Sequence, residues 1–492
     1  MLLSSYINSC GKENAREDWS SIILGVFLYR MKKEEEFRMR KKWLAWMSIA
    51  SLVGMLAAGA GPAMAQEQSV LPVRVSQETV AAKLAFTNQD HLWLLDARER
   101  GSSPKQVTVD GAAQIVGWSA DGEWLLFLKY KGSDTYSTPG YLWAVKADGT
   151  VAVQLDDRPV MDQPKWSPTG LQVAFFVNGG SAENPQSMFL IKEWKNGAVS
   201  EVYSEKNVDF VDFSWMPDGK QLLVSTPATK DRGMTLQLRE LTGKTTASYP
   251  IAPPPNMEEG IWPWAARALA ISSDGVHVGY YLQYNSASLS ADGVPIQLFD
   301  RSQPKRKPVD LGTGLIHTQW LRWSPDGKQL AFIDGTDRMA TSHKHLKFAD
   351  TNGKVVSDSP EGNVDTLPVW TLGAPYSVFF SRGEAAEYHY DPNKVMVPGQ
   401  RIWQQAVGEK AQQVTKGTNA TADYYPAPSL DGKQLLFVRL DNALHGSVFL
   451  SWQGKETELL RNVTGDIGYY GNYLPEWVSV YWERETAPKP GA

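Results

Sequence analysis

Short apolar runs separated by polar turns recur along most of the chain. Residues 124–128, 173–176 and 435–438 are typical runs, and each follows a turn of the form Trp-Ser-x-Asp-Gly or a close variant. Runs of this length between turn sequences predict β-strands. No segment has a convincing helical period, so we expect an all-β chain.

The turns return at a nearly constant interval. The glycines of successive copies are 48, 49, 56, 52 and 105 residues apart, and residues 370–381 fill the double interval as a degenerate copy. About four short strands fit into each period, which is typical of the blades of a β-propeller. The residues that define the copies, all expected to be structural, are Trp118, Asp121, Gly122, Trp166, Gly170, Trp215, Asp218, Gly219, Asp274, Gly275, Trp323, Asp326, Gly327, Asp431 and Gly432.

The two ends of this region together supply one more blade. Residues 84–87, 92–95 and 106–109 indicate three strands without a turn copy before them, and residues 474–480 supply the missing first strand. With seven internal units, this predicts a single propeller of eight four-stranded blades, closed by N- and C-terminal strands that cover each other's edges. If the degenerate copy is an insertion, the count is seven.

The repeat units resemble the WD40-like PD40 repeats of TolB-type propellers, which are related to the propellers of prolyl oligopeptidases. The resemblance covers nearly all of residues 80–482, and its departures are Thr169 in place of Asp and Ile271 and Pro428 in place of Trp. It implies a propeller and suggests a periplasmic partner system. We expect neither the N-terminal α/β domain of TolB nor a hydrolase domain.

A secretory signal is predicted at residues 39–65. Residues 39–42 are basic apart from Met39, residues 43–62 are uncharged, and a small-x-small site ends at Ala65, where we expect cleavage. An uncleaved membrane anchor is the alternative. Residues 1–38 contain acidic residues where a signal peptide should be basic. We interpret residues 1–38 as not translated in the cell, because the start codon is misplaced.

The remaining boundaries follow from these assignments. Residues 66–79 are expected to form a linker, residues 80–482 the propeller, and residues 483–492 a flexible tail. The predicted location is outside the cell or in the periplasm and cell envelope, without stable membrane insertion after cleavage.

Charge and cysteine content narrow the functional classes. Without residues 1–65, which carry nine basic and six acidic residues, the chain has 40 Lys and Arg against 48 Asp and Glu, a net charge of −8. This balance argues against nucleic acid, which requires a basic face. The single cysteine, Cys10, lies in the removed part, so no disulfide or thiol chemistry is expected. We expect a monomer.

Catalytic motifs are absent from the sequence. It contains no G-x-S-x-G elbow, no H-E-x-x-H pair and no phosphate-binding G-x-x-x-x-G-K loop. His343 and His345 have the spacing of one strand face, but no third ligand lies near them in sequence, and zinc needs one. We therefore assign no catalytic residue, no metal and no cofactor.

The strongest binding candidates are aromatic and acidic residues on the face opposite the repeat turns, where loops carry function. Trp262 and Trp264 follow a proline-rich acidic segment; they either pack under their loop as a small apolar cluster or form a ligand platform. The other aromatic candidates are Tyr424, Tyr425, Tyr469, Tyr470 and Tyr473. Acids that could line the channel mouth are Asp162, Asp209, Asp212, Asp365 and Asp423.

Two functions from different classes remain. The first is a non-catalytic binding or scaffolding propeller with a protein or peptide partner in the cell envelope or outside the cell. The alternative is a carbohydrate-active propeller enzyme, a lyase or glycosidase, that uses channel-mouth carboxylates around a metal.

Overall fold

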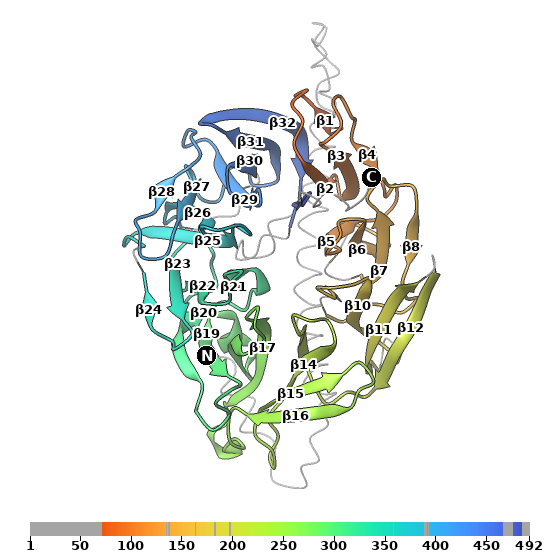
Figure 1. The fold of residues 1–492 in the computed structure, drawn as a ribbon, viewed down its shortest axis with the longest axis vertical. Helices are drawn as coiled ribbons and strands as arrows, with labels where there is room; N and C mark the ends of the chain where they lie inside the picture. Colours follow the sequence, from red (N-terminus) through yellow and green to blue (C-terminus); the bar gives the residue numbers. More distant parts are fainter. Residues whose placement is uncertain are drawn as a thin grey trace, which may run out of the picture. The chain divides into compact units, whose positions relative to one another are not determined.

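The described part of the protein folds into eight antiparallel sheets arranged in a ring (Figure 1). A computed structural model describes residues 71–133, 135, 138–162, 164–181, 184–195, 198–357, 359–387, 391, 393–465 and 476–484. Seven sheets have four strands and one has five. The expected all-β propeller with eight blades is thus confirmed, and the alternative of seven blades is wrong.

Blades 1 to 4 each use four strands in chain order, with the first strand innermost. Their bounds are β5 Ala113–Trp118, β6 Trp124–Tyr130, β7 Gly140–Lys146 and β8 Ala152–Gln154; β9 Lys165–Trp166, β10 Gln172–Asn178, β11 Ser187–Lys195 and β12 Ala198–Lys206; β13 Asp212–Trp215, β14 Gln221–Thr226, β15 Thr235–Glu240 and β16 Thr245–Pro250; β17 Pro263–Ile271, β18 His277–Tyr284, β19 Val294–Asp300 and β20 Val309–Gly314.

Blades 5 to 8 repeat this order around the other half of the ring. Their bounds are β21 Leu321–Trp323, β22 Gln329–Asp334, β23 His345–Asp350 and β24 Val355–Val356; β25 Asn363–Trp370, β26 Val378–Glu384, β27 Arg401–Gln405 and β28 Gln412–Gln413; β29 Ala422–Pro428, β30 Gln434–Asn442, β31 His445–Trp452 and β32 Lys455–Thr464, with β1 Val73–Arg74 outside; β33 Val478–Trp482, β2 Ala82–Asn88, β3 His91–Asp96 and β4 Lys105–Gln106.

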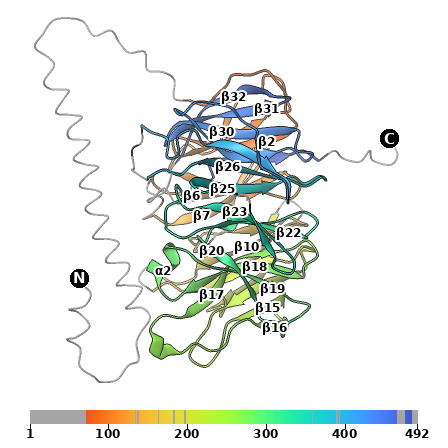
Figure 2. The same ribbon diagram turned by 90° about the vertical axis from the view of Figure 1, so that its left-hand side faces the viewer.

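Helix is almost absent from the described residues. The 3₁₀ turns η1 Met257–Glu259 and η2 Thr318–Trp320 and the five-residue α2 Ala287–Ala291 are loop elements. The side view shows α2 projecting from one face of the ring (Figure 2). This is the face of the loops between blades, opposite the repeat turns.

The ring closes through β33 and β2, which are far apart in the sequence. Ala82 pairs with Trp482 and Phe86 with Val478 in an antiparallel ladder. The closing strand begins at Val478, four residues after the predicted start, and residues 466–475 lie outside the described residues. The segment expected as a linker also contributes β1, which pairs with the outer strand of blade 7.

The hydrophobic core lies between blades. One cluster joins blades 2 and 3, where Phe176, Phe189 and Phe213 pack edge to face with centroids 5.1–5.7 Å apart. Such aromatic contacts add to the stabilisation gained from burial. Neighbouring sheets therefore hold one another, and each blade depends on the next.

The repeat tryptophans link the inner strands of neighbouring blades. An inner strand has no partner strand on its channel side. The carbonyl groups on that side therefore need hydrogen-bond donors from elsewhere. The indole N–H of one blade donates to such a carbonyl in the preceding blade. These bonds run from Trp118 to Ser479 (3.2 Å), Trp166 to Gly117 (3.1 Å), Trp215 to Lys165 (3.0 Å), Trp323 to Ala270 (3.0 Å), Trp370 to Arg322 (2.9 Å) and Trp482 to Ala427 (3.1 Å).

Four of the repeat turns share a hydrogen-bond pattern. In the first copy, Ser119 donates to the Asp121 carboxylate at 2.6 Å, Trp124 N–H donates to Ser119 Oγ at 3.0 Å, and Gly122 has a φ of +67°. The same Ser–Asp bond occurs in the copies at Asp274, Asp326 and Asp431. Turns of successive blades also touch, because Thr169 Oγ1 donates to Asp218 O. The turns therefore share one face, as expected.

The indole bond can be tested with Trp370→Phe against Trp93→Phe. Both side chains are buried, but Trp93 Nε1 has no hydrogen-bond partner among the described residues. Both exchanges remove the same ring atoms, and only Trp370→Phe removes a donor from a carbonyl. We expect Trp370→Phe to lower the free energy of unfolding by about 1 kcal/mol more than Trp93→Phe in denaturant titrations. Equal losses would show that the bond contributes nothing.

Candidate functional site

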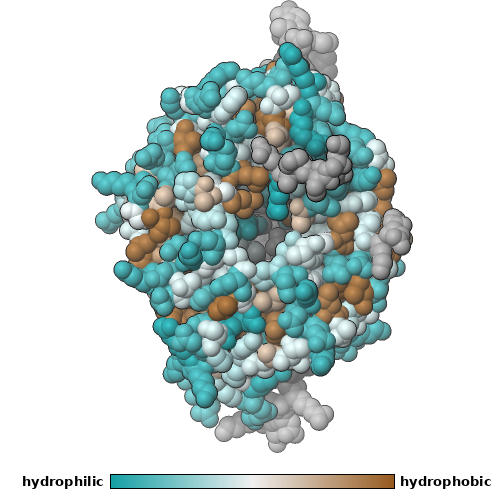
Figure 3. All heavy atoms as spheres, in the orientation of Figure 1, coloured by the Kyte–Doolittle hydropathy of each residue, from teal (hydrophilic) through white to brown (hydrophobic). Residues whose placement is uncertain are grey.

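A cavity of about 440 Å³ lies at the centre of the ring, on the face of the repeat turns. The space-filling view shows this face hollowed at its centre (Figure 3). The lining comes from the inner strands and turns of blades 5, 6, 7, 8 and 1, so the cavity occupies one side of the channel. Its volume is within the range of natural ligand pockets.

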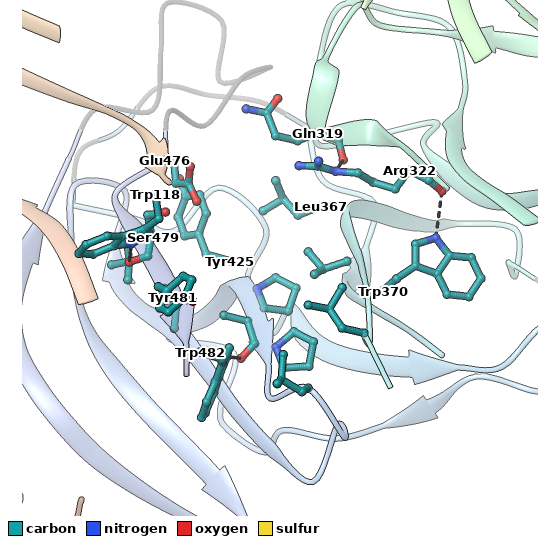
Figure 4. Close-up of a pocket in the computed structure, with 18 of the residues that line it drawn as sticks. Trp118, Gln319, Arg322, Leu367, Trp370, Tyr425, Glu476, Ser479, Tyr481 and Trp482 are labelled. Atoms are coloured by element: carbon teal, nitrogen blue, oxygen red, sulfur yellow. Dashed lines mark hydrogen bonds between the residues drawn. The ribbon is translucent and has the colours of Figure 1, made fainter. Parts of the chain in front are cut away.

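The wall of the cavity is largely apolar and rigid. Leu367 and Tyr425 have left-handed backbones, with φ of 55° and 52°, at bulges where β25 and β29 shift register. Pro368 and Pro426 follow them, as suits residues that cannot donate to a ladder. Bulges redirect side chains, and these two bulges place Leu367 and Tyr425 in the cavity lining (Figure 4).

Two ionisable side chains from opposite sides face the same cavity. Arg322 extends from the inner strand β21, and Glu476 lies just before β33 on the far side (Figure 4). Arg322 is exposed to the cavity, and its Nε donates to Gln319 O at 3.3 Å. Partial removal from bulk water lowers the pKa of Arg322, and the charge of Glu476 counteracts this.

Glu476 titrates near neutrality. Burial raises its pKa to about 7, against the opposing effects of Arg322 and of a side-chain hydrogen bond with Ser479. The other ionisable groups that line the cavity are Tyr425, Tyr481 and Arg484. The cavity therefore changes its net charge within the physiological pH range.

The four aromatic candidates that the structure describes do not lie together in one site. Trp262 and Trp264 are half-buried at the start of β17, where Trp262 exchanges two hydrogen bonds with Asn285. Tyr424 is buried in the core between blades 7 and 8, where burial raises its pKa. Tyr425 lines the central cavity. Tyr469, Tyr470 and Tyr473 lie outside the described residues.

Two of the candidate acids are buried in arginine pairs. Asp365 accepts two hydrogen bonds from Arg382, at 2.6 and 2.9 Å, and Asp423 accepts two from Arg439, at 2.8 and 2.9 Å. Burial raises the pKa of Asp423 despite Arg439. These carboxylates hold strands together and are not presented to a ligand.

The other three acids lie in ion pairs on the side of blades 2 to 4. Burial opposes the ionisation of Asp212, but Lys165 and Arg267 outweigh it and hold its pKa below its ordinary value. Asp162 pairs with Arg267 at 3.0 Å, and the exposed Asp209 pairs with Arg239 at 2.7 Å. On this side of the channel, the candidate acids are therefore paired with cations of the same chain.

The histidine pair does not form a metal site in the described part of the chain. Lys344 between the two histidines is fully buried and donates to three backbone carbonyls. Across the residues that the structure describes, no group of three or more His, Cys, Asp or Glu side chains could hold a metal ion. Nor does any helix within those residues have the length and apolarity to cross a membrane.

Of the residues that line the cavity, only Tyr425 was among the binding candidates predicted from the sequence, although one signal for another was present. The residue directly before the repeat Trp faces the channel, and in blade 5 this residue is Arg322, before Trp323. Lys165 has the same position in blade 2. The convergence of Arg322 and Glu476 depends on ring closure, which brings residues 154 positions apart into one cavity.

The fold defines the chain as an eight-bladed β-propeller. No protein-family model matches the chain. No curated protein matches it significantly either. The class of the protein therefore rests on its own strand pairing.

Solved structures with similarity to the chain include TolB propellers and peptidase propeller domains. TolB from Acinetobacter baumannii is 13% identical with a TM-score of 0.36, over 56% of this chain and 63% of that one. The putative TolB from Agrobacterium tumefaciens is 16% identical with a TM-score of 0.30, over 58% and 94%. The propeller domain of the Trilobed protease from Pyrococcus furiosus is 11% identical with a TM-score of 0.41, over 70% and 97%.

These similarities concern the fold alone. The chain spans less than two thirds of the A. baumannii TolB structure and 50% of a similar prolyl endopeptidase. The propeller architecture itself is shown by the eight sheets of this chain.

The structural role of the buried acids can be tested with Asp365→Asn against Asp209→Asn. Asp365 is fully buried with Arg382, whereas the Asp209 side chain is 45% exposed. We expect Asp365→Asn to lower the free energy of unfolding by about 3–5 kcal/mol, because it leaves a buried guanidinium unpaired. Asp209→Asn should cost less than about 1 kcal/mol. A Ca²⁺-dependent increase in Tm that Asp365→Asn abolishes would contradict this assignment.

Glu476 predicts a pH dependence of stability. The pKa of Glu476 is higher in the folded protein than the ordinary value of a glutamate, so protonation of this side chain stabilises the fold. This contribution to stability is complete below the ordinary pKa and is lost as the pH rises through about 7. Glu476→Gln cannot ionise. Because the cavity is open to water, we expect the Tm of Glu476→Gln to exceed that of the wild type only modestly at pH 8, by about 2–4 °C. The gain should vanish at pH 4.

The matched control is Glu361→Gln at an exposed loop position. Its Tm difference from the wild type should be the same at both pH values. A Glu476→Gln difference that does not change with pH would refute the assignment.

Proposed function

We propose that this chain is an exported, non-catalytic propeller that binds a protein partner through a peptide segment held in the central cavity. The observation that carries the proposal is the cavity itself, about 440 Å³ in volume and lined by fixed inner-strand residues. Concave, mostly apolar pockets with few polar groups are the usual form of binding sites.

The lining suits a peptide. Tyr425, Tyr481 and Trp482 offer aromatic surfaces of the kind that anchor binding partners, and Leu372 stands at the rim with 55% of its surface exposed. The Trp482 indole is fixed by its bond to Ala427 O at 3.1 Å. A preformed wall loses little conformational entropy when a partner binds.

The carbohydrate-active alternative receives less support. It requires carboxylates that are free to hold a metal or to transfer protons. Asp365 and Asp423 are committed to Arg382 and Arg439, and Asp212 to Lys165. The acids that motivated the alternative are therefore occupied by structural pairs.

Export is part of the proposal. It rests on the signal sequence at residues 39–65, which lies outside the described residues. Processing of the precursor after Ala65 and recovery of the product outside the cytoplasm are the corresponding expectations.

The binding function can be tested by selecting random peptides displayed on phage against the purified full-length protein. We expect selected peptides to bind, and Leu372→Glu to weaken their affinity at least about tenfold, or 1.4 kcal/mol. A charge at the rim should repel apolar side chains without disturbing the core. Leu289→Glu is the matched control, because Leu289 is 43% exposed on α2, outside the cavity. Failure to select any peptide, or equal effects of both variants, would contradict the proposal.

A further inference from the structure

The cavity contains a guanidinium with unused donors. Of the three nitrogens of Arg322, only Nε has a hydrogen-bond partner in the described part of the chain, at Gln319 O. The two terminal nitrogens project into the cavity from β21 (Figure 4). A guanidinium presents its donors as a planar fork that matches the two oxygens of a carboxylate.

We propose that Arg322 recognises the free C-terminal carboxylate of the bound peptide, an inference that rests on the proposed function. The carboxylate would accept two hydrogen bonds from the terminal nitrogens of Arg322. The residues before it would lie against the apolar wall around Leu367, Tyr425 and Pro368.

The position of the cavity favours a chain end over an internal acidic residue. Inner strands and turns from five neighbouring blades line it on one side of the channel, and it opens on the face of the repeat turns. A C-terminus enters such a space as one extended strand. An internal Asp or Glu needs a second segment leading out again, and a cavity of about 440 Å³ is near the lower end of the range for ligand pockets.

The distribution of charge around the channel also favours the C-terminus of a peptide. On the side of blades 2 to 4, Lys165 and Arg267 are paired with Asp212 and Asp162. In the cavity, Glu476 lies across from Arg322 (Figure 4) and influences it electrostatically, but the two form no ion pair within 4 Å in the described part of the chain. An incoming carboxylate therefore finds an available cation at Arg322.

Glu476 should modulate the affinity. When ionised it repels an incoming carboxylate and attracts Arg322; when protonated it does neither. The ionisable groups that face it across the cavity are Arg322, Tyr425, Tyr481 and Arg484. A peptide α-carboxyl stays ionised above pH 5, so binding should strengthen as the pH falls from 8 to 6.

The experiment uses two phage libraries against the full-length protein. One displays random heptapeptides with free C-termini, and the other carries the same heptapeptides followed by a constant Gly-Ser tail. The strongest binder is then synthesised as the free acid and as the C-terminal amide. Calorimetry gives the Kd of both forms for the wild type, Arg322→Gln, Arg322→Lys and the control Arg306→Gln, an exposed position away from the cavity.

We expect enrichment only from the free C-termini, and at least tenfold tighter binding of the acid than of the amide. Arg322→Gln should reduce the affinity for the acid to that for the amide while leaving the amide unchanged. Arg322→Lys should retain part of the preference, and Arg306→Gln all of it. The preference should grow from pH 8 to pH 6 in the wild type and stay constant in Glu476→Gln.

The failures of the two proposals are distinguishable. Equal binding of acid and amide, or equal enrichment from both libraries, would overturn the role of Arg322 and leave peptide binding intact. No enrichment from either library would overturn peptide binding itself. An equal loss for acid and amide in Arg322→Gln would identify Arg322 as structural.

Discussion

The hydrogen bond from a tryptophan indole to the inner-strand carbonyl of the preceding blade is the constraint on which this ring depends. Inner strands have a ladder partner on one side only, and their free carbonyl groups face the channel, where an unpaired polar group is costly. The six indole bonds supply donors at these positions and fix the distance between neighbouring inner strands. Trp118 and Trp482 hold β33 from both sides, so the closing strand is secured by its neighbours as well as by β2.

One of the two departures from this pattern borders the cavity. At two of the repeat positions the tryptophan is replaced, by Ile271 in blade 4 and by Pro428 in blade 7. Pro428 lies in the cavity lining, and it provides neither the volume nor the donor of an indole. The bulges at Leu367 and Tyr425, which also line the cavity, belong to blades 6 and 7. The cavity lining therefore combines three blades that keep the indole bond, at Trp118, Trp370 and Trp482, with one blade that lacks it.

The repeat made the fold predictable, because each turn copy carries local information: Asp121 bonds its own turn, Gly122 takes a positive φ, and Trp118 marks the end of an inner strand. The count of eight followed once the two ends were matched. The cavity was harder to predict from the sequence. The alternation of apolar and polar residues along a strand does not show which channel-facing residues of different blades come together. Asp365 resembled a channel-mouth acid in the sequence, and only the register of β25 and β26 shows that Arg382 lies opposite it.

The distribution of charge along the channel connects the scaffold with binding. Where blades 2 to 4 meet, Arg267 binds Val211 O and Asp162, and Lys165 binds Asp212 and Phe213 O, so these cations join inner strands and have few donors left. Arg322 has the same position in its blade as Lys165, directly before the repeat Trp. Its side chain, however, donates only to Gln319 O of its own blade among the residues that the structure describes. A cation whose donors are not used for joining blades is available to another molecule. The same repeat position therefore serves stability on one side of the ring, and on the other side it carries the cation to which we assign recognition.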